Sequence, residues 1–298
     1  MRVVAIDVGQ SGSRARSSGG LDFRTGPAFD PGNGIVDNVR QVIAAAGTPE
    51  ADVLALSLTG LRGTVPEPRE IGEACSQMTG ATSVAVADDG FAAHAGALGL
   101  TDGVVLAVGS GTVAVSRCDD GVAHRDGDGA LLGDDGSGFW IGREGLRAAL
   151  RDHEGRGPST ALTHALDSRF GSLHHAVRTQ PERELMRWCI EAAQTVLITA
   201  AAGDDVAQEI RATAAGLLAA TAAAAWRAVS TDDRPASVSF TGGVLADREF
   251  RELLATRLAD VMPEAIVKDP IGDNLDGALV IASSVLRDLP PLLRWWHR

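Results

Sequence analysis

The sequence predicts an α/β protein of two related domains with a cleft between them. Its 298 residues are about twice the commonest domain size, which allows two domains of ordinary length. The pattern of strand, glycine turn and strand opens the chain and begins again after Thr101, so the architecture looks duplicated. Apolar residues at helical spacing follow both hairpins. No low-complexity linker separates the halves, so we expect them to pack against each other.

The first half alternates strands with helices, and we place the N-terminal domain at residues 1–102. The opening "RVVAIDV" predicts a buried strand at 2–8, followed by the turn "GQSG" and a second strand from Ser13. The further elements expected here are a helix at 35–46, a strand at 53–58, a strand at 83–87 and a helix at 91–98.

The second half, placed at residues 103–283, begins with "GVVLAVGSGTVAVSR", which again predicts two strands around a glycine turn. Residues 183–228 are alanine-rich and helical in pattern. The stretch at 237–245, "SVSFTGGVL", predicts a strand that leads through two glycines into a helix, and another helix starts near Asp276. We expect a closing helix at about 284–298 to pack back on the N-terminal domain.

Composition narrows the class of protein. The net charge of -12 argues against a nucleic-acid partner, because phosphate backbones reward a basic face. The cysteines Cys75, Cys118 and Cys189 lie far apart, without the close pairing of a zinc or redox site. No apolar stretch is long enough to span a bilayer, and the opening residues reach acid and glycine too soon for a signal peptide. We therefore expect a cytoplasmic protein with reduced thiols and no membrane partner.

Three glycine turns at strand ends are candidate phosphate or nucleotide contacts. In "DVGQSGS", Asp7 ends a buried strand beside exposed backbone N–H groups, which suits a phosphate-bound Mg²⁺ held through water. The alternative is an ordinary hairpin with a turn-stabilising Asp. "AVGSGT" (107–112) repeats the turn and adds hydroxyls, and "FTGGVL" (240–245) opens a helix against which a nucleotide could lie.

Two acidic segments admit both a chemical and a structural interpretation. Asp88 and Asp89 stand between a strand and a helix, where a carboxylate caps the helix or acts as a general base. In "LLGDDGSGFWIGREGLRAAL", Asp134 precedes a helix in the same way. Asp135 or Ser137 can satisfy the first N–H groups of that helix, which leaves Asp134 free to face the cleft.

Taken in order, these segments resemble the BadF/BadG/BcrA/BcrD-type ATPase family, and within it the N-acetylglucosamine kinase-like sugar kinases of the actin-like ATPase superfamily. "LLGDDGSGFWIGREGLRAAL" is similar to the family's G-D-E-G-S-x-x-W-I-G signature, and "GRGPST" follows it. Supporting matches are "IDVGQSGSR", "AVGSGTVA", "TGGVL" and "DGALVIA". The resemblance implies two actin-like (ribonuclease H-like) domains with an interdomain cleft.

Carried over residue by residue, the resemblance implies ATP and Mg²⁺ as cofactors and a sugar as substrate. It makes Asp7 the acid on the magnesium side and Asp89 the catalytic base, which also contacts the sugar. Asn33 and Asp134 would bind the sugar hydroxyls. The implied phosphate contacts are Gly9, Gln10, Ser11, Gly109, Ser110, Gly111 and Thr112, and the implied adenosine contacts are Gly242 and Gly243.

The chain departs from the family pattern at three points. The usual glycine and basic residue of the first hairpin are replaced in "DVGQSGS". Asp128 stands where the sugar kinases have a tryptophan, and a carboxylate lining the pocket would favour the ammonium of glucosamine. Alternatively, "GDG" is a hairpin turn that faces solvent. The cysteines also lack the paired motifs with which the family's acyl-CoA dehydratase activators bind an iron–sulfur cluster.

The leading hypothesis is an ATP-dependent kinase that phosphorylates a hydroxyl of N-acetylglucosamine, glucosamine or a related hexose. One alternative is a cluster-bearing activator ATPase of the acyl-CoA dehydratase or reductase type. Another is a non-catalytic sugar or nucleotide sensor. The family pattern leaves a homodimer open.

Overall fold

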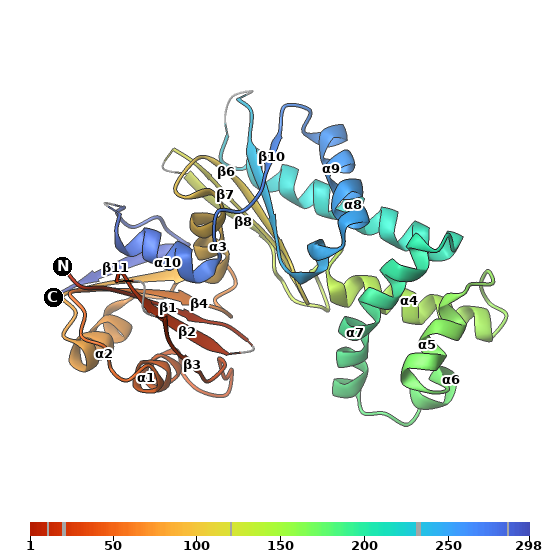
Figure 1. The fold of residues 1–298 in the computed structure, drawn as a ribbon, viewed down its shortest axis with the longest axis horizontal. Helices are drawn as coiled ribbons and strands as arrows, with labels where there is room; N and C mark the ends of the chain where they lie inside the picture. Colours follow the sequence, from red (N-terminus) through yellow and green to blue (C-terminus); the bar gives the residue numbers. More distant parts are fainter. Residues whose placement is uncertain (11, 20–21, 120, 231–233, 285) are drawn as a thin grey trace.

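The computed structural model describes residues 1–10, 12–19, 22–119, 121–230, 234–284 and 286–298. In this part of the chain, two sheets lie side by side, each with helices packed on its faces (Figure 1). The predicted α/β class and its two-part organisation are therefore confirmed. No helix within the described ranges is long and apolar enough to cross a membrane.

The first sheet has six described strands in the order β11-β5-β4-β1-β2-β3. These strands are β1 (Val3–Val8), β2 (Ser13–Ser17), β3 (Asp22–Gly26), β4 (Val53–Leu58), β5 (Ser83–Asp88) and β11 (Leu293–His297). β1 pairs with β2 as an antiparallel hairpin and with β4 in parallel. All six residues of β1 are buried, as the apolar run at 3–8 predicts for a central strand covered on both faces.

Alternating side chains on this sheet meet two different helical layers. Val4 and Ile6 pack with α1 (Ile35–Ala45) and α2 (Arg69–Thr79) on one face. The opposite face carries small residues such as Ala5, Ala55 and Ala85, and α3 (Asp89–Leu98) and α10 (Asn274–Ala282) pack there. Asp7 is two residues beyond Ala5, so its side chain lies on the α3 and α10 face.

The second sheet has five described strands in the order β10-β9-β6-β7-β8. These are β6 (Gly103–Val108), β7 (Thr112–Cys118), β8 (Gly121–Asp126), β9 (Ser237–Thr241) and β10 (Ile266–Lys268). The helical elements around it are α4 (Gly138–His153), α5 (Leu162–Phe170), α6 (Leu173–Ala176), α7 (Glu182–Ala201), α8 (Asp205–Arg227), the short 3₁₀ helix η1 (Gly243–Ala246) and α9 (Arg248–Val261). The largest apolar core joins α4, α7, α8 and α9 to this sheet.

Helix α3 lies between the two sheets and contacts both. Its Phe91 and Ala95 belong to the core of the first sheet, whereas Ala93 and Ala97 pack with Val105 of the second. In the part of the chain that the structure describes, two short segments cross between the sheets, 99–102 and 269–273. The second crossing is hydrogen-bonded to the end of α3, because the amides of Ile271 and Gly272 donate to carbonyl oxygens of Ala97 and Gly96.

Helices α3 and α10 cross with their backbones in contact. A Cβ atom at Gly96 would lie 1.9 Å from the Asp273 carbonyl oxygen, and one at Gly277 would lie 1.9 Å from the Ala92 carbonyl oxygen. Since the opposing atoms are backbone, no rotamer change can make room. The glycines therefore set how closely α10 approaches α3.

The closing helix expected at about 284–298 is wrong, because β11 is a strand that pairs antiparallel with β5. Pro290 and Pro291 precede it and disfavour a helix there. Trp295 and Trp296 then pack on opposite faces of the sheet, as the period of a strand requires. The proposed domain limits stay a prediction, but α10, inside the range assigned to the second domain, packs on the first sheet.

Gly277→Ala should lower the free energy of unfolding by about 1–3 kcal/mol, because the added methyl group collides with backbone at the α3–α10 crossing. Gly216→Ala in α8 is the matched control, since no atom lies within 4 Å of its Cβ position. There the same substitution should raise the free energy of unfolding by about 0.5–1 kcal/mol through helix propensity. Urea unfolding measures both, and equal effects at the two sites would contradict the close crossing.

Candidate active site

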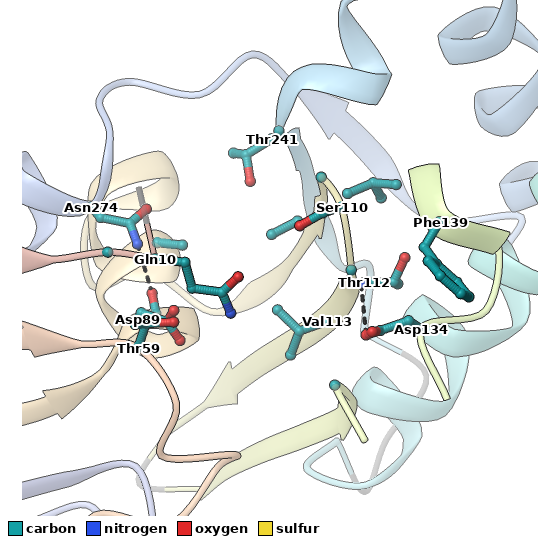
Figure 2. Close-up of a pocket in the computed structure, with 18 of the residues that line it drawn as sticks. Gln10, Thr59, Asp89, Ser110, Thr112, Val113, Asp134, Phe139, Thr241 and Asn274 are labelled. Atoms are coloured by element: carbon teal, nitrogen blue, oxygen red, sulfur yellow. Dashed lines mark hydrogen bonds between the residues drawn. The ribbon is translucent and has the colours of Figure 1, made fainter. Parts of the chain in front are cut away.

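A cavity of about 1430 Å³ lies between the two sheets and takes its lining from both. Figure 2 shows Asp89 on the side of the first sheet and Asp134 on the side of the second, with Gln10 reaching between them. The predicted site residues that line the cavity are Gly9, Gln10, Asp89, Gly109, Ser110, Gly111, Thr112, Asp134 and Gly242. Ser11 lies outside the described residues.

The glycine turns form the middle of the cavity. The Gly9 amide donates to the Gly12 carbonyl oxygen, and the Gly109 amide donates to that of Gly111, each at 2.9 Å. The second turn also receives the start of α4, because the Phe139 amide donates to the Ser110 carbonyl oxygen. Two strand-ending turns thus present backbone and hydroxyl groups to one space, an arrangement that suits an anion such as a phosphate chain.

One end of the cavity has an apolar and cationic character. Phe240, Leu245 and Ala246 line it, and the Arg251 guanidinium lies 6.0 Å from the centre of the Phe240 ring. Gly242 comes so close to Val108 that a Cβ atom would lie 2.3 Å from the Val108 carbonyl oxygen. Gly243 is not among the lining residues. This end has room and chemistry for a planar aromatic ring such as a nucleotide base.

Asp88 and Asp89 divide the two roles that the sequence left open. Asp88 is the N-cap of α3: its Oδ1 accepts the Gly90 amide and its Oδ2 accepts the Gly63 amide, both at 3.0 Å. Asp89 is therefore not needed for the cap, and its side chain accepts a hydrogen bond from Thr59. The Asn274 amide nitrogen donates to the Asp89 carbonyl oxygen at 3.1 Å (Figure 2).

The environment of Asp89 keeps its proton affinity high. Burial, together with the nearby carboxylates of Asp88 and Asp7, raises the pKa of Asp89 to about 6, and the hydrogen bond from Thr59 opposes this rise. A carboxyl group with this pKa is ionised at neutral pH yet accepts a proton readily. It has the properties of a general base.

Asp7 lies below the cavity lining and is 9% exposed. Its Oδ1 accepts a hydrogen bond from the Ser57 hydroxyl at 2.8 Å, and its Oδ2 accepts one from Arg14 Nη2 at 2.9 Å. Arg14 also pairs with Asp273, the N-cap of α10, at 2.6 Å. Asp7 is thus held in place on both oxygens, and its role toward a metal stays a prediction. No cluster of three or more metal-ligating side chains occurs among the described residues.

Asp134 is free of the helix that follows it, as predicted. Ser137 caps α4 by accepting the Trp140 amide. Asp134 instead accepts the Thr112 amide at 3.1 Å (Figure 2). This hydrogen bond joins the loop between β8 and α4 (127–137), here called the signature loop, to the second glycine turn. Burial raises the pKa of Asp134, and the carboxylates of Asp126 and Asp128 add to the rise.

Asn33 and Asp128 do not line the cavity, and both are exposed. Asn33 lies in a turn in which its side-chain amide donates to Asp30 at 3.1 Å. Asp128 lies in the turn between Gly127 and Gly129. Asp128 is exposed, whereas the two glycines are partly buried. The structure therefore places these two predicted sugar contacts outside the cavity lining, and their roles stay predictions.

Asp126 organises the signature loop, and the sequence reasoning missed it. Its Oδ1 accepts the amides of Gly127 and Asp134 at 2.8 and 2.6 Å, and its Oδ2 accepts the Asp135 amide at 3.1 Å. Its backbone has a φ of 63°, a conformation in which Asp is one of the tolerated residues. The "DGDG" pattern carried this signal, because Asp commonly accepts backbone amides in turns.

Other lining residues were also missed. Thr59 and Arg62 belong to the segment "TGLRG" after β4, and Asn274 begins α10. His124 comes from β8, which the sequence analysis did not predict. They became functional candidates only through tertiary structure, since no local pattern distinguishes them.

Comparisons with known proteins confirm the family resemblance drawn from the sequence. The sequence model of the BadF/BadG/BcrA/BcrD ATPase family matches residues 11–282. The N-acetylmuramic acid/N-acetylglucosamine kinase of Clostridium acetobutylicum is 25% identical over 217 residues, 67% of this chain and 67% of that protein. The N-acetyl-D-glucosamine kinase of Dictyostelium discoideum is 26% identical over 205 residues, 64% of this chain, and the match spans only 62% of that relative.

Solved structures show the same fold. A protein of Chromobacterium violaceum assigned as an N-acetylglucosamine kinase superposes with a TM-score of 0.69 and 24% identity, covering 95% of this chain and 99% of that chain. A ROK family glucokinase from Streptomyces griseus, in complex with glucose and AMPPNP, gives a TM-score of 0.56 and 16% identity, covering 95% and 98%. These likenesses confirm the two-domain actin-like fold.

Asp126→Ala should release the signature loop, because three backbone amides lose their acceptor. We expect amide hydrogen exchange at Asp134 and Asp135 to accelerate at least about tenfold and the free energy of unfolding to fall by about 1–3 kcal/mol. Asp128→Ala, two residues along and exposed, is the control and should change neither. Unaltered exchange in Asp126→Ala would show that the loop holds its shape without this carboxylate.

Proposed function

This chain belongs to the BadF/BadG/BcrA/BcrD ATPase family, and we propose that it is an ATP-dependent kinase that phosphorylates a hydroxyl of an amino sugar. N-acetylglucosamine is the first candidate substrate, and a related hexose the next. The names of the two curated relatives support this proposal, since both are kinases of N-acetylated amino sugars.

The observation that carries the proposal is the combination of chemical groups that line one cavity. The lining includes Phe240 and Arg251, the glycine turns at Gly9 and Gly109, and the carboxylates of Asp89 and Asp134, which lie on its two sides with Gln10 between them (Figure 2). An adenine ring, a chain of phosphates and a polyhydroxylated acceptor need groups of these three kinds. Transfer then requires mainly positioning and charge stabilisation.

Asp89 is proposed as the base. A sugar hydroxyl oxygen attacks the terminal phosphorus of ATP, the bond from that phosphorus to the ADP oxygen breaks, and the hydroxyl proton passes to the Asp89 carboxylate. Thr59 holds this carboxylate through a hydrogen bond, and Asn274 holds its backbone. Closing of the two domains over the sugar would exclude water and so suppress hydrolysis of ATP.

Asp134 is proposed to orient the sugar. One of its oxygens already accepts the Thr112 amide, so the other is available for a sugar hydroxyl or an acetamido N–H group. Asp128, by contrast, is exposed and outside the lining, so the structure adds no support for a preference for the ammonium of glucosamine, which stays a prediction. We therefore favour the acetylated sugar.

Mg²⁺ is proposed to accompany ATP. Asp7 presents hard oxygen donors on the α3 side of the first sheet, and Ser57 and Arg14 leave further lone pairs on both oxygens. Such a carboxylate suits a hydrated Mg²⁺, which keeps several of its waters and binds phosphates directly. When bound, the ion neutralises the charge of the phosphate chain. A homodimer stays a prediction.

The iron–sulfur activator hypothesis gains no support from the cysteines. Cys75, Cys118 and Cys189 lie on α2, β7 and α7, three separate elements. Burial raises the pKa of Cys75 to about 12, and it also raises that of Cys189. Cluster ligands must be thiolates, so these side chains are poorly suited to the task.

An ADP-release screen across amino sugars and hexoses, with the wild type beside Asp89→Asn, tests the proposal. We expect turnover that depends on an added sugar, with N-acetylglucosamine preferred to glucosamine, and a 10²- to 10⁴-fold lower kcat in Asp89→Asn. In the wild type, kcat/KM should fall as the pH drops below about 6, because Asp89 then carries a proton. Unchanged sugar-dependent turnover in Asp89→Asn would overturn this choice of base.

The free energy of unfolding of Asp89→Asn shows whether a loss of activity comes from the missing base or from a damaged fold. The folded-state pKa of Asp89, about 6, lies above its ordinary value of 3.8, so its ionised form destabilises the folded protein at neutral pH. Asp89→Asn should therefore raise the free energy of unfolding at pH 7.5. The gain should shrink at pH 5, where the wild-type carboxyl is already protonated in the folded state.

Asp134→Ala should raise the KM for the sugar at least about tenfold, because a charged hydrogen-bond acceptor is lost, while folding loses only about 1 kcal/mol. Asp135→Ala is the control, since this neighbour is exposed and should leave the KM unchanged. Thermal unfolding run beside the kinetics measures the second effect. A variant that merely unfolds would show that Asp134 has a structural role instead.

A further inference from the structure

His124 is the one histidine among the residues that line the cavity, and the chemistry above does not use it. It lies in β8 of the second sheet, and its side chain is 15% exposed. The ring faces the segment after β4 and the start of α3, which both belong to the first sheet and its helices. It therefore joins the two halves of the molecule at the floor of the cavity.

Two glycines form a slot for the imidazole ring. A Cβ atom at Gly63 would lie 2.7 Å from Cγ of His124, and one at Gly127 would lie 2.9 Å from Cε1. Gly63 comes from the first half and Gly127 from the second, and their φ angles are 73° and 78°. No side chain fits at either position with the ring in place. The backbone on both sides of the ring therefore packs directly against His124.

Within this slot, the ring points to the residue that positions the proposed base. His124 Nε2 lies 4.0 Å from Asp88 Oδ1. Asp88 caps α3 and binds the Gly63 amide, and the next residue along the chain is Asp89. A shift of the second half by about 1 Å toward the first would bring Nε2 within hydrogen-bonding distance of Asp88.

Burial keeps the ring neutral although most of the charged groups around it are acidic. Asp88 and Asp89 face it from the N-terminus of α3, Asp126 ends β8 and Asp128 follows it, and Arg125 is the neighbour of His124 in β8. Burial lowers the pKa of His124 from its ordinary value near 6.5, although Asp89 and the other carboxylates oppose this. At neutral pH the imidazole is thus uncharged and carries a single N–H group.

We propose that His124 is a positioning residue that donates from Nε2 to Asp88 Oδ1 when the cleft closes, and thereby fixes Asp89 in its reactive orientation. The inference rests on the proposed function to the extent that Asp89 is the base. In this inference, His124 of the second domain aligns Asp88 and Asp89 of the first domain. Closure of the cleft would then also place the base in its reactive orientation.

The test compares His124→Gln with His124→Met. The two replacement side chains are unbranched and nearly equal in length, but only Gln carries an N–H donor near the position of Nε2. We expect His124→Gln to retain most of the wild-type kcat and His124→Met to lose about 10- to 100-fold, with the KM for ATP unaltered in both. Equal thermal unfolding temperatures would show that both variants fold.

Other outcomes overturn the inference. If His124→Met matches His124→Gln, the ring only fills the slot, and if both lose activity equally, the donor is not what matters. A wild type without sugar-dependent turnover would refute the proposed function, and the tautomer then decides this inference separately. Nitrogen NMR of the imidazole, assigned with His124→Gln, should show Nε2 protonated at pH 7.5, and an Nε2 without a proton contradicts it.

Discussion

The site depends on how the N-terminus of α3 is held. Asp88 is 1% exposed, and its two oxygens accept amides from α3 itself and from the segment after β4. Burial of a carboxylate is costly unless hydrogen bonds compensate for it, and here the backbone supplies them. Because Asp88 takes the cap, the next carboxylate is released toward the cavity. Every proposed role of Asp89 depends on Asp88 being the residue that caps α3.

The same arrangement places several acids close together, and Arg14 of β2 counterbalances part of this charge. Asp7, Asp88 and Asp89 lie near enough for the first two to raise the pKa of the third. Arg14 binds both Asp7 and Asp273, so it joins the hairpin of β1 and β2 to the start of α10. Burial is the main source of the high proton affinity of Asp89, and the uncompensated part of this repulsion adds to it. The same environment thus accounts for a stability cost and for the property on which the proposed catalytic role depends.

Sequence reasoning predicted the parts of the site that depend on local structure. The glycine turns after β1 and β6 and the strand before Asp89 follow from periodicity and turn chemistry, and the capping role of Ser137 follows from its position before an apolar helix. The contributions of Thr59, Asn274 and His124 could not be predicted, because each depends on elements distant in the sequence. Asn33 and Asp128 were inferred from resemblance alone, and neither is among the residues that line the cavity. The helix predicted at the end of the chain was wrong, because this segment pairs with the free edge of β5 as a strand.

The two crossings between the sheets lie together at the end of α3, where the amides of Ile271 and Gly272 bind its last turn. In the closure proposed above, two tethers at one edge favour a rotation about that edge over sliding or twisting of the sheets. A movement confined to one rotation costs little conformational entropy. Groups near the tethers would then keep their spacing, while the opposite side of the cavity opens and closes most.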